Sequence, residues 1–409
     1  MNHQSMLTLQ GDGRIVYIAA IDLTEPLSPF SKDLENHSTL ERLANRLKSE
    51  LPNWIIEHQV RLANLRVGQS VRIASQQIDD LLLRMSLNED ALKVLSEQFQ
   101  SRLREMNPDH TFTAQIVRFS VLVFSDAFIS VELELFVKDA WSDHLHSFEE
   151  LFGPRARQQN IVEHIVRDLL IKPQKSISAT GVIPELQSAL CEGIVETTQV
   201  RPKMIPPEIY YYHVLYSADT SKELPGTYPL DYSARTWLYP PDPDPICSMS
   251  PFIDEFVYCG FAFSLLVAPR FDEERWHSLI SLVRIVQYHY FRLTEVCDEL
   301  SERKRNGNQL EARGLTLLEL RLHQKYDQLS VPTFTFNHRI LKIRDGIMKE
   351  WRIDSTLRRA RNLIENIRTV ESLKREERAK WINGVLTVIA ILTLIGAVEA
   401  FVNLLLILH

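Results

Sequence analysis

Two groups of residues in this 409-residue sequence combine types and spacings that could do chemistry. In the first, Glu399 and Asn403 stand one helical turn apart in an apolar stretch near the end of the chain. Gly396 and Ala400 form a small-xxx-small pair beside them, which lets two helices approach closely. In a ring of identical helices, Glu399 would form a ring of carboxylates that attracts cations. If Glu399 lies among the far headgroups of a bilayer instead, it would simply be hydrated.

The second group lies in the stretch WSDHLHSFEE, where Asp143, His144 and His146 are suitable ligands for a divalent cation. A His-x-His spacing on a strand would place both imidazole rings on one face. The spacing matches no established metal motif, and a polar surface turn explains the same residues. We therefore expect no cofactor, with a divalent cation as the one alternative. No nucleotide-binding, hydrolase, kinase or zinc-protease motif occurs, so we expect no enzyme activity. A catalytic site of another kind in the α/β domain, built on the same Asp143, His144 and His146, is the weaker alternative.

The element that must position Glu399 is a membrane-spanning helix. From Ile382 to Val398 the sequence holds 17 residues without a charge, and apolar residues resume after Glu399 as far as Leu408. As a helix, Ile382–Leu408 would be about 40 Å long, whereas the hydrocarbon core of a bilayer is about 30 Å thick. Its apolar side chains outweigh the cost of about 3 kcal/mol for one carboxylate. A buried core helix is the alternative, but such helices are seldom apolar on all faces.

The flanks of this stretch predict how it lies in the membrane. Basic residues stay on the cytoplasmic side, and Trp381 occupies the place of an interfacial aromatic residue. Asn383 and Thr387 lie on the side opposite to Glu399, so the polar residues do not form one continuous stripe. We expect a single-pass protein of the inner membrane with a cytoplasmic N-terminus. The basic residues at the predicted interface are Lys374, Arg375, Arg378 and Lys380.

Composition and charge limit the other classes of function. The chain is 45% hydrophobic and 24% charged, which is ordinary for a globular protein, and its net charge is −7. From Arg339 to Lys380 there are 13 basic and 7 acidic residues, so the remainder of the chain is strongly acidic. Such a chain is a poor candidate for nucleic-acid binding. Four cysteines without a CxxC pair predict free thiols in a reducing compartment.

Two further parts are expected before the span. Residues 1–270 mix helical spacing with alternating, β-branched segments, which is typical of an α/β domain. Residues 271–380 show helical periodicity throughout and predict a stalk that packs against copies of itself or against neighbouring helices. The transmembrane helix itself is expected over residues 381–408.

Some element boundaries follow from turn residues and periodicity. The glycines of Gly11-Asp12-Gly13 predict a hairpin turn, and residues 73–106 predict a helix. The stretch 111–141 predicts two strands with a turn near Ser125-Asp126. From Asn337 onward the apolar residues form one stripe, which predicts a continuous helix into the membrane. Two helices with a bend near Asp354-Ser355 are the alternative.

This arrangement resembles the CorA-type divalent cation transporters. In that family the stalk helix enters the bilayer through a motif to which Leu386-Thr387-Val388-Ile389-Ala390 is similar, with Asn383 just ahead of it. The sequence departs from the family in two respects. The Gly-Met-Asn motif of the pore mouth would fall at Leu404-Leu405-Leu406, and a second span would have to follow His409. Magnesium selectivity is therefore not implied by the resemblance.

What the resemblance implies is an oligomer of identical subunits in the lipid bilayer. A cytoplasmic sensor domain would respond to a small-molecule or protein activator and act through the stalk on a ring of C-terminal helices. The output would be ion passage or loss of membrane integrity, and CorA-like proteins also serve as ligand-gated effectors in antiviral defence. The alternative is a tail-anchored scaffold that docks a partner protein through its α/β domain.

Overall fold

The chain divides into two units in a computed structural model. The model describes residues 10–22, 37–58, 81–106, 113–124, 128–138, 161–173, 181–198, 210–218, 227–228, 246–260, 263–306, 316, 319–320, 322–323 and 338–408. One unit comprises Met1–Phe291 with Tyr326–Ile353, and the other comprises Arg292–Lys325 with Asp354–His409. The first unit is built on a β-sheet with helices, and the second contains a long C-terminal helix. The predicted α/β domain and long final helix are therefore confirmed.

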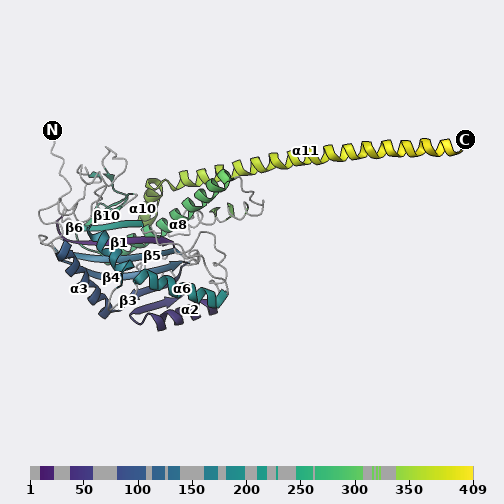
Figure 1. The fold of residues 1–409 in the computed structure, drawn as a ribbon. Coiled ribbons are helices and arrows are strands. Elements are labelled where there is room, and N and C mark those ends of the chain that lie inside the picture. The colour runs from purple at the N-terminus through teal and green to yellow at the C-terminus, as the bar shows by residue number, and fades with distance from the viewer. Residues whose placement is uncertain are drawn as a thin grey trace. The chain divides into compact units, whose positions relative to one another are not determined.

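An eight-stranded sheet forms the centre of the first unit (Figure 1). The strands are β1 (Gln10–Asp22), β2 (Trp54–His58), β3 (Leu81–Leu87), β4 (Thr113–Phe124), β5 (Phe128–Lys138), β6 (Tyr210–Ala218), β7 (Thr227–Tyr228), β8 (Ile246–Cys247), β9 (Phe256–Cys259) and β10 (Phe263–Ala268). Across the large sheet their order is β2-β3-β4-β5-β1-β6-β10-β9. Neighbouring strands are antiparallel except for β6 and β10, which are parallel. The strands β7 and β8 pair separately.

Helices bury both faces of this sheet. On one face, apolar side chains of β1 and β5, such as Tyr17 and Leu133, share a core with the helices α2 (His37–Glu50), α3 (Glu89–Met106), α5 (Ile161–Ile171) and α6 (Val182–Thr198). The opposite face contacts the first half of α8 (Glu273–Asn306), where Tyr288 stacks on Phe124 of β4 at 4.4 Å. Because side chains alternate along a strand, residues next to each other in β5 lie in different layers.

Two predicted elements are wrong. Gly11-Asp12-Gly13 lie inside β1 instead of in a hairpin turn, and the pairing of β1 with β6 shifts register between Gln10 and Gly13. The segment Leu81–Leu87 is strand β3, because Leu83 and Met85 alternate with polar residues and β3 has strand partners on both sides. The helix does begin at Glu89, as α3, and the part predicted before Leu81 lies outside the described residues.

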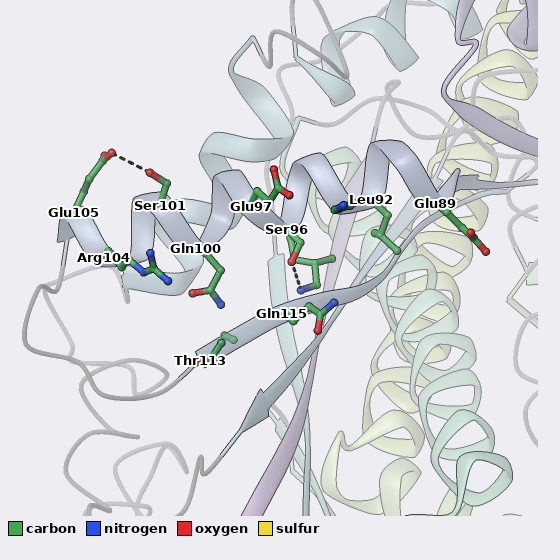
Figure 2. A pocket seen from close by; sticks show the side chains of 13 residues that line it. Glu89, Leu92, Ser96, Glu97, Gln100, Ser101, Arg104, Glu105, Thr113 and Gln115 are labelled. Carbon is green, nitrogen blue, oxygen red and sulfur yellow. Dashed lines mark hydrogen bonds between the residues drawn. The ribbon is translucent and has the colours of Figure 1, made fainter.

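The predicted pair of strands within 111–141 is confirmed as β4 and β5. The pairing of β3 with β4 ends at Ser86↔Ser120, so β4 extends beyond its neighbour. There the chain turns into α3, which runs beside the free part of β4 (Figure 2). The hydroxyl of Ser96 accepts a hydrogen bond of 3.1 Å from the backbone N–H of Ile116. A helix side chain thus satisfies an edge amide that a strand would otherwise bind.

The helical stripe from Asn337 is divided into two helices, α10 (His338–Glu350) and α11 (Ile353–Leu408). Between them, Arg352 has a φ of 53°, in the left-handed region that ends a helix. The predicted single helix is therefore wrong, and the alternative of two helices is confirmed with a break two residues before the expected bend. The helix α11 then continues for 56 residues, about 84 Å, into the apolar stretch.

Candidate functional site

The C-terminal part of α11 carries the main functional candidate, because its apolar side chains face outward. Ile353–Val398 contains a stretch long and apolar enough to cross a membrane, and the chain itself buries none of that stretch. Trp381 is 72% exposed, and Leu394 is 67% exposed. At about 25 cal/mol for each Å² of apolar surface, contact with water along the whole stretch would be strongly unfavourable. A lipid bilayer would remove this cost, so the stretch is a candidate membrane span.

The start of the same helix behaves differently. In the second unit, Leu357, Ala360 and Ile364 are buried, and the Cys297 thiol near the end of α8 lies 3.5 Å from the carbonyl oxygen of Thr356. Arg368 also forms an ion pair with Glu319. One face of α11 thus packs against its own chain at the beginning. From position 372 onward, every described side chain of the helix is exposed.

The threonines of the apolar stretch do not present free hydroxyl donors. Thr387 Oγ1 donates to the carbonyl oxygen of Asn383, and Thr393 Oγ1 donates to that of Ile389, each at 2.8 Å. Such bonds to the preceding turn satisfy a hydroxyl within its own helix. These two side chains can therefore face hydrocarbon without the cost of an unpaired donor.

The predicted packing and pore residues all lie on α11. At 100° per residue, Asn383 and Thr387 fall on one side of the helix, and the other four fall on the opposite side. An added Cβ at Gly396 would meet no atom of the chain within 4 Å, so packing within the chain does not require its small size. A function in pore lining or helix packing remains a prediction for this set. The four on the second side are Gly396, Glu399, Ala400 and Asn403.

The predicted interfacial residues also lie on α11, directly before the apolar stretch. All are exposed, which is compatible with the predicted position at a membrane surface. Arg375 approaches Glu371 at 3.9 Å, a surface pair that adds little to stability. The set is Lys374, Arg375, Arg378, Lys380 and Trp381.

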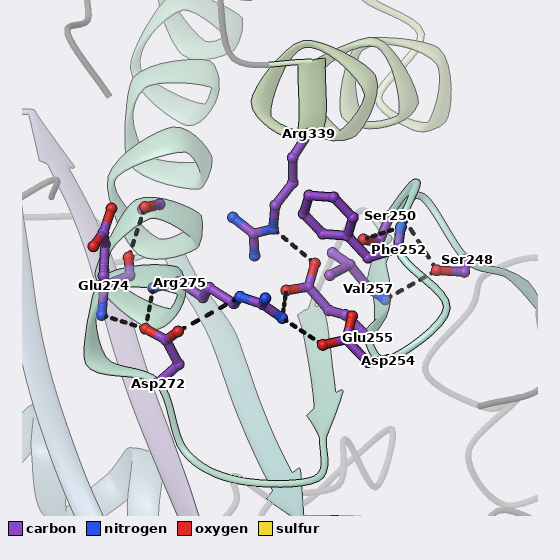
Figure 3. Close-up of polar contacts among 11 residues, drawn as sticks. Ser248, Ser250, Phe252, Asp254, Glu255, Val257, Asp272, Glu274, Arg275 and Arg339 are labelled. Atoms are coloured by element: carbon purple, nitrogen blue, oxygen red, sulfur yellow. Dashed lines mark hydrogen bonds and ion pairs between the residues drawn. The ribbon is translucent and has the colours of Figure 1, made fainter. Parts of the chain in front are cut away.

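A buried ion pair anchors α10, the helix that precedes α11, to the sheet of the first unit. Arg339 Nε lies 2.7 Å from Oε1 of Glu255, the residue directly before β9, and both side chains are buried (Figure 3). Glu255 also lies 3.5 Å from Arg275 at the start of α8, which itself pairs with Asp254 and Asp272. Arginines from two helices, α8 and α10, therefore contact one buried carboxylate.

The turn after α10 is held by further contacts within the first unit. Trp351 Nε1 donates to the carbonyl oxygen of Gly260 at 2.8 Å, and its ring packs edge-on against Tyr290. A Cβ at Gly346 would lie 2.6 Å from the sulfur of Met249, so the Met249 side chain packs directly against the glycine of α10. The chain is thus fixed to the α/β unit up to Trp351, immediately before Arg352 and α11.

A layer of buried charges between the sheet and α8 was missed by the sequence analysis. Glu134 lies 2.8 Å from Arg14 and accepts a hydrogen bond of 3.0 Å from the indole of Trp276. Glu132 lies 2.8 Å from Arg284 and 3.5 Å from Arg118. The alternation of β5 is typical of a strand with one face in water, but α8 covers that face. A polar stripe along α8, formed by His277, Ser281 and Arg284, was the available signal.

Arginines keep Glu132 ionised in this layer. Burial raises the pKa of its carboxyl, but Arg284 and Arg118 together have a larger effect, so the pKa lies below its ordinary value. His277 lies beside a positive charge, because the guanidinium nitrogens of Arg118 are 3.1 and 3.2 Å from its two ring nitrogens. Burial, followed by the charge of Arg118, lowers the pKa of His277. At neutral pH the ring is uncharged and the carboxylate is charged.

Acidification from about pH 7.5 to about 5.5 should therefore lower the free energy of unfolding through His277. In this window the unfolded chain takes up a proton on His277 more readily than the folded chain, so stability falls as the pH falls. We expect His277→Gln to reduce the slope of unfolding free energy against pH, measured by urea titration with tryptophan fluorescence in detergent. Equal slopes for the variant and the parent would contradict this assignment.

The remaining predicted residues are the candidate cation ligands and the cysteines. Asp143, His144 and His146 lie outside the described residues, so the suggested divalent cation site remains untested. Within the described ranges, no three His, Cys, Asp or Glu residues are grouped as metal ligands. Three of the cysteines, Cys191, Cys259 and Cys297, are free thiols as predicted.

Comparisons with known proteins add no relative: no family model, no curated protein and no solved structure matches this chain.

Proposed function

We propose that the chain is an oligomeric membrane protein of CorA-like architecture, in which a cytoplasmic α/β domain acts on a ring of C-terminal helices. The observation that carries the proposal is the continuity of α11 from the turn at Arg352 into the exposed apolar stretch. A change in the α/β unit that moves α10 would move the start of this helix. The buried Glu255–Arg339 pair and the Trp351–Gly260 hydrogen bond hold α10 in a defined position in the α/β unit, from which such a change could move it.

The ring is needed because one helix encloses no water. Small residues on α11 allow close contacts between copies, and Gly396 has open space around it in the single chain. The basic residues before Trp381 favour a cytoplasmic N-terminus and insertion in the inner membrane. The activator would be a small molecule or a protein bound by the α/β unit, and the output would be ion passage or membrane damage, as in antiviral defence.

A second function, a tail-anchored scaffold, is favoured by one specific observation. The hydroxyls of Thr387 and Thr393 are satisfied within their own helix, so they do not need water or a neighbouring helix. A span of this kind can serve as an anchor alone, with the α/β unit docking a partner protein.

The subunit number separates the two functions most directly. Mass measurement of the full chain in nanodiscs should give a closed oligomer if the helices form a pathway, and a monomer would exclude it. Replacing residues 382–408 with an unrelated apolar helix of equal length is the second test. A scaffold should keep its cellular activity after this exchange, whereas a pathway lined by α11 should lose it. Glu399→Ala alone should then reduce ion flux, with Glu399→Asp as the charge-preserving control.

A further inference from the structure

A groove between α3 and the free edge of β4 has the dimensions of a ligand site (Figure 2). Its volume is about 920 Å³, and its walls are side chains of α3 together with residues 113–116 of β4. This volume lies within the range of about 300–1,000 Å³ that is usual for binding sites. We propose that this groove binds an extended peptide segment of a partner protein, which adds as a strand beside β4.

The first argument is the pairing of β4. Its partner β5 accompanies it from Thr113, but on the other side β3 pairs only with residues 120–124. Among the described residues, the first half of β4 therefore has a strand neighbour on one side only. Strand addition at such an edge is a recurring mode of peptide recognition, in which main-chain hydrogen bonds supply affinity.

The second argument is the direction of the backbone groups. The N–H of Ile116 points into the groove, since it donates to Ser96 Oγ at 3.1 Å. Successive residues of a strand alternate, so Ala114 directs its N–H and C=O toward the same side, away from β5. Because Ser96 already binds the Ile116 N–H, the groups of Ala114 are the ones placed to bind the backbone of an incoming strand.

The third argument concerns the side chains that line the groove. The amide nitrogen of Gln100 is buried and has no hydrogen-bond partner among the described residues. Figure 2 shows the Gln100 side chain directed from α3 toward β4. A backbone carbonyl of an added strand would satisfy this donor, whose isolation otherwise costs about 1–3 kcal/mol.

Length and charge define the class of partner. From Glu89 to Glu105, α3 rises about 24 Å, which corresponds to about seven extended residues. The rim carries three carboxylates and two cations, so a segment containing a lysine or an arginine is the better match. The charged rim residues are Glu89, Lys93, Glu97, Arg104 and Glu105.

The test uses the full chain in nanodiscs and a displayed library of random peptides of about nine residues, slightly longer than the groove. Each enriched peptide is synthesised in three forms: unmodified, N-methylated at odd positions, and N-methylated at even positions. In strand addition only alternate amides face β4, so one methylated form should bind about tenfold more weakly or worse, while the other should bind like the parent. Gln100→Trp, which fills the groove, should weaken binding similarly, whereas Asp90→Trp on the same helix should not.

The proposal is overturned if no peptide binds the unchanged chain more tightly than it binds the Gln100→Trp variant. It is equally overturned if both methylated forms of every enriched peptide bind as well as the parent. Because the methylation series uses the unchanged protein, it decides the matter even if Gln100→Trp folds poorly. Neither result depends on the oligomer or on the membrane helix, so the proposed function stands or falls separately.

Discussion

Two arginines in the middle of α11, Val388→Arg with Leu392→Arg, should release most of the chain from the membrane. An arginine at the centre of a span costs about 2.5–3.5 kcal/mol, and each lost apolar residue removes about 0.3–0.6 kcal/mol. The pair therefore opposes insertion by about 6–8 kcal/mol. The seventeen Leu, Ile, Val and Phe residues of Ile382–Leu408 provide about 5–10 kcal/mol, of which Glu399 offsets about 3. The balance consequently turns against insertion.

The measurement is the fraction of protein that stays in the membrane pellet after alkaline carbonate extraction. A matched control places the same two arginines earlier on the same helix, as Thr369→Arg with Ser372→Arg, where both side chains are exposed and outside the apolar stretch. We expect the control to remain in the pellet. If the double variant at 388 and 392 remained there as well, correctly folded, α11 would not be a membrane span.

Glu132→Gln should destabilise the α/β unit by about 3–5 kcal/mol, because it leaves the guanidinium of Arg284 buried without its counter-charge. Both side chains lie almost completely within the layer between the sheet and α8, where water cannot solvate the remaining charge. Burial lowers the pKa of Arg284, and the charge of Glu132 opposes this effect. The nearby charges of Arg84 and Arg118 lower the pKa further. The loss of one carboxylate therefore affects several cations together.

The control for this change is Glu57→Gln, which removes a carboxylate from the pair between β2 and β3. Glu57 lies 3.7 Å from Arg84, and its side chain is 55% exposed, so we expect a loss below about 1 kcal/mol. Glu132→Leu combined with Arg284→Leu should be less destabilising than Glu132→Gln, since it removes both charges. Urea unfolding of all three variants in detergent gives the comparison. A Glu132→Gln protein as stable as the Glu57→Gln protein would show that the buried pair is not important for stability.

The two proposals concern different surfaces of the protein. The apolar stretch of α11 belongs to the second unit, whereas the groove beside β4 belongs to the first. A peptide bound in the groove would suit the scaffold as a docked partner, and it would suit the membrane effector as a protein activator. Measuring ion flux with and without an enriched peptide would distinguish these two uses of one groove.

The sequence alone determined the features that depend on local composition and periodicity. The apolar stretch after Trp381, the strands β4 and β5 and the helical periodicity after residue 271 were recognised because their patterns extend over many residues. The strand β3 was misread as helix, because seven residues with five apolar side chains fit either periodicity until the neighbouring strands supply hydrogen bonds.

Only the tertiary structure decided which polar residues are buried. Glu132 and Glu134 occupy alternate positions of β5 that are equally compatible with solvent and with a covering layer, and the layer comes from α8, more than a hundred residues later in the sequence. The break at Arg352 was likewise decided by distant contacts, those of Trp351 with Gly260 and Arg339 with Glu255. Local patterns record what a segment prefers, whereas burial depends on which distant segment packs against it.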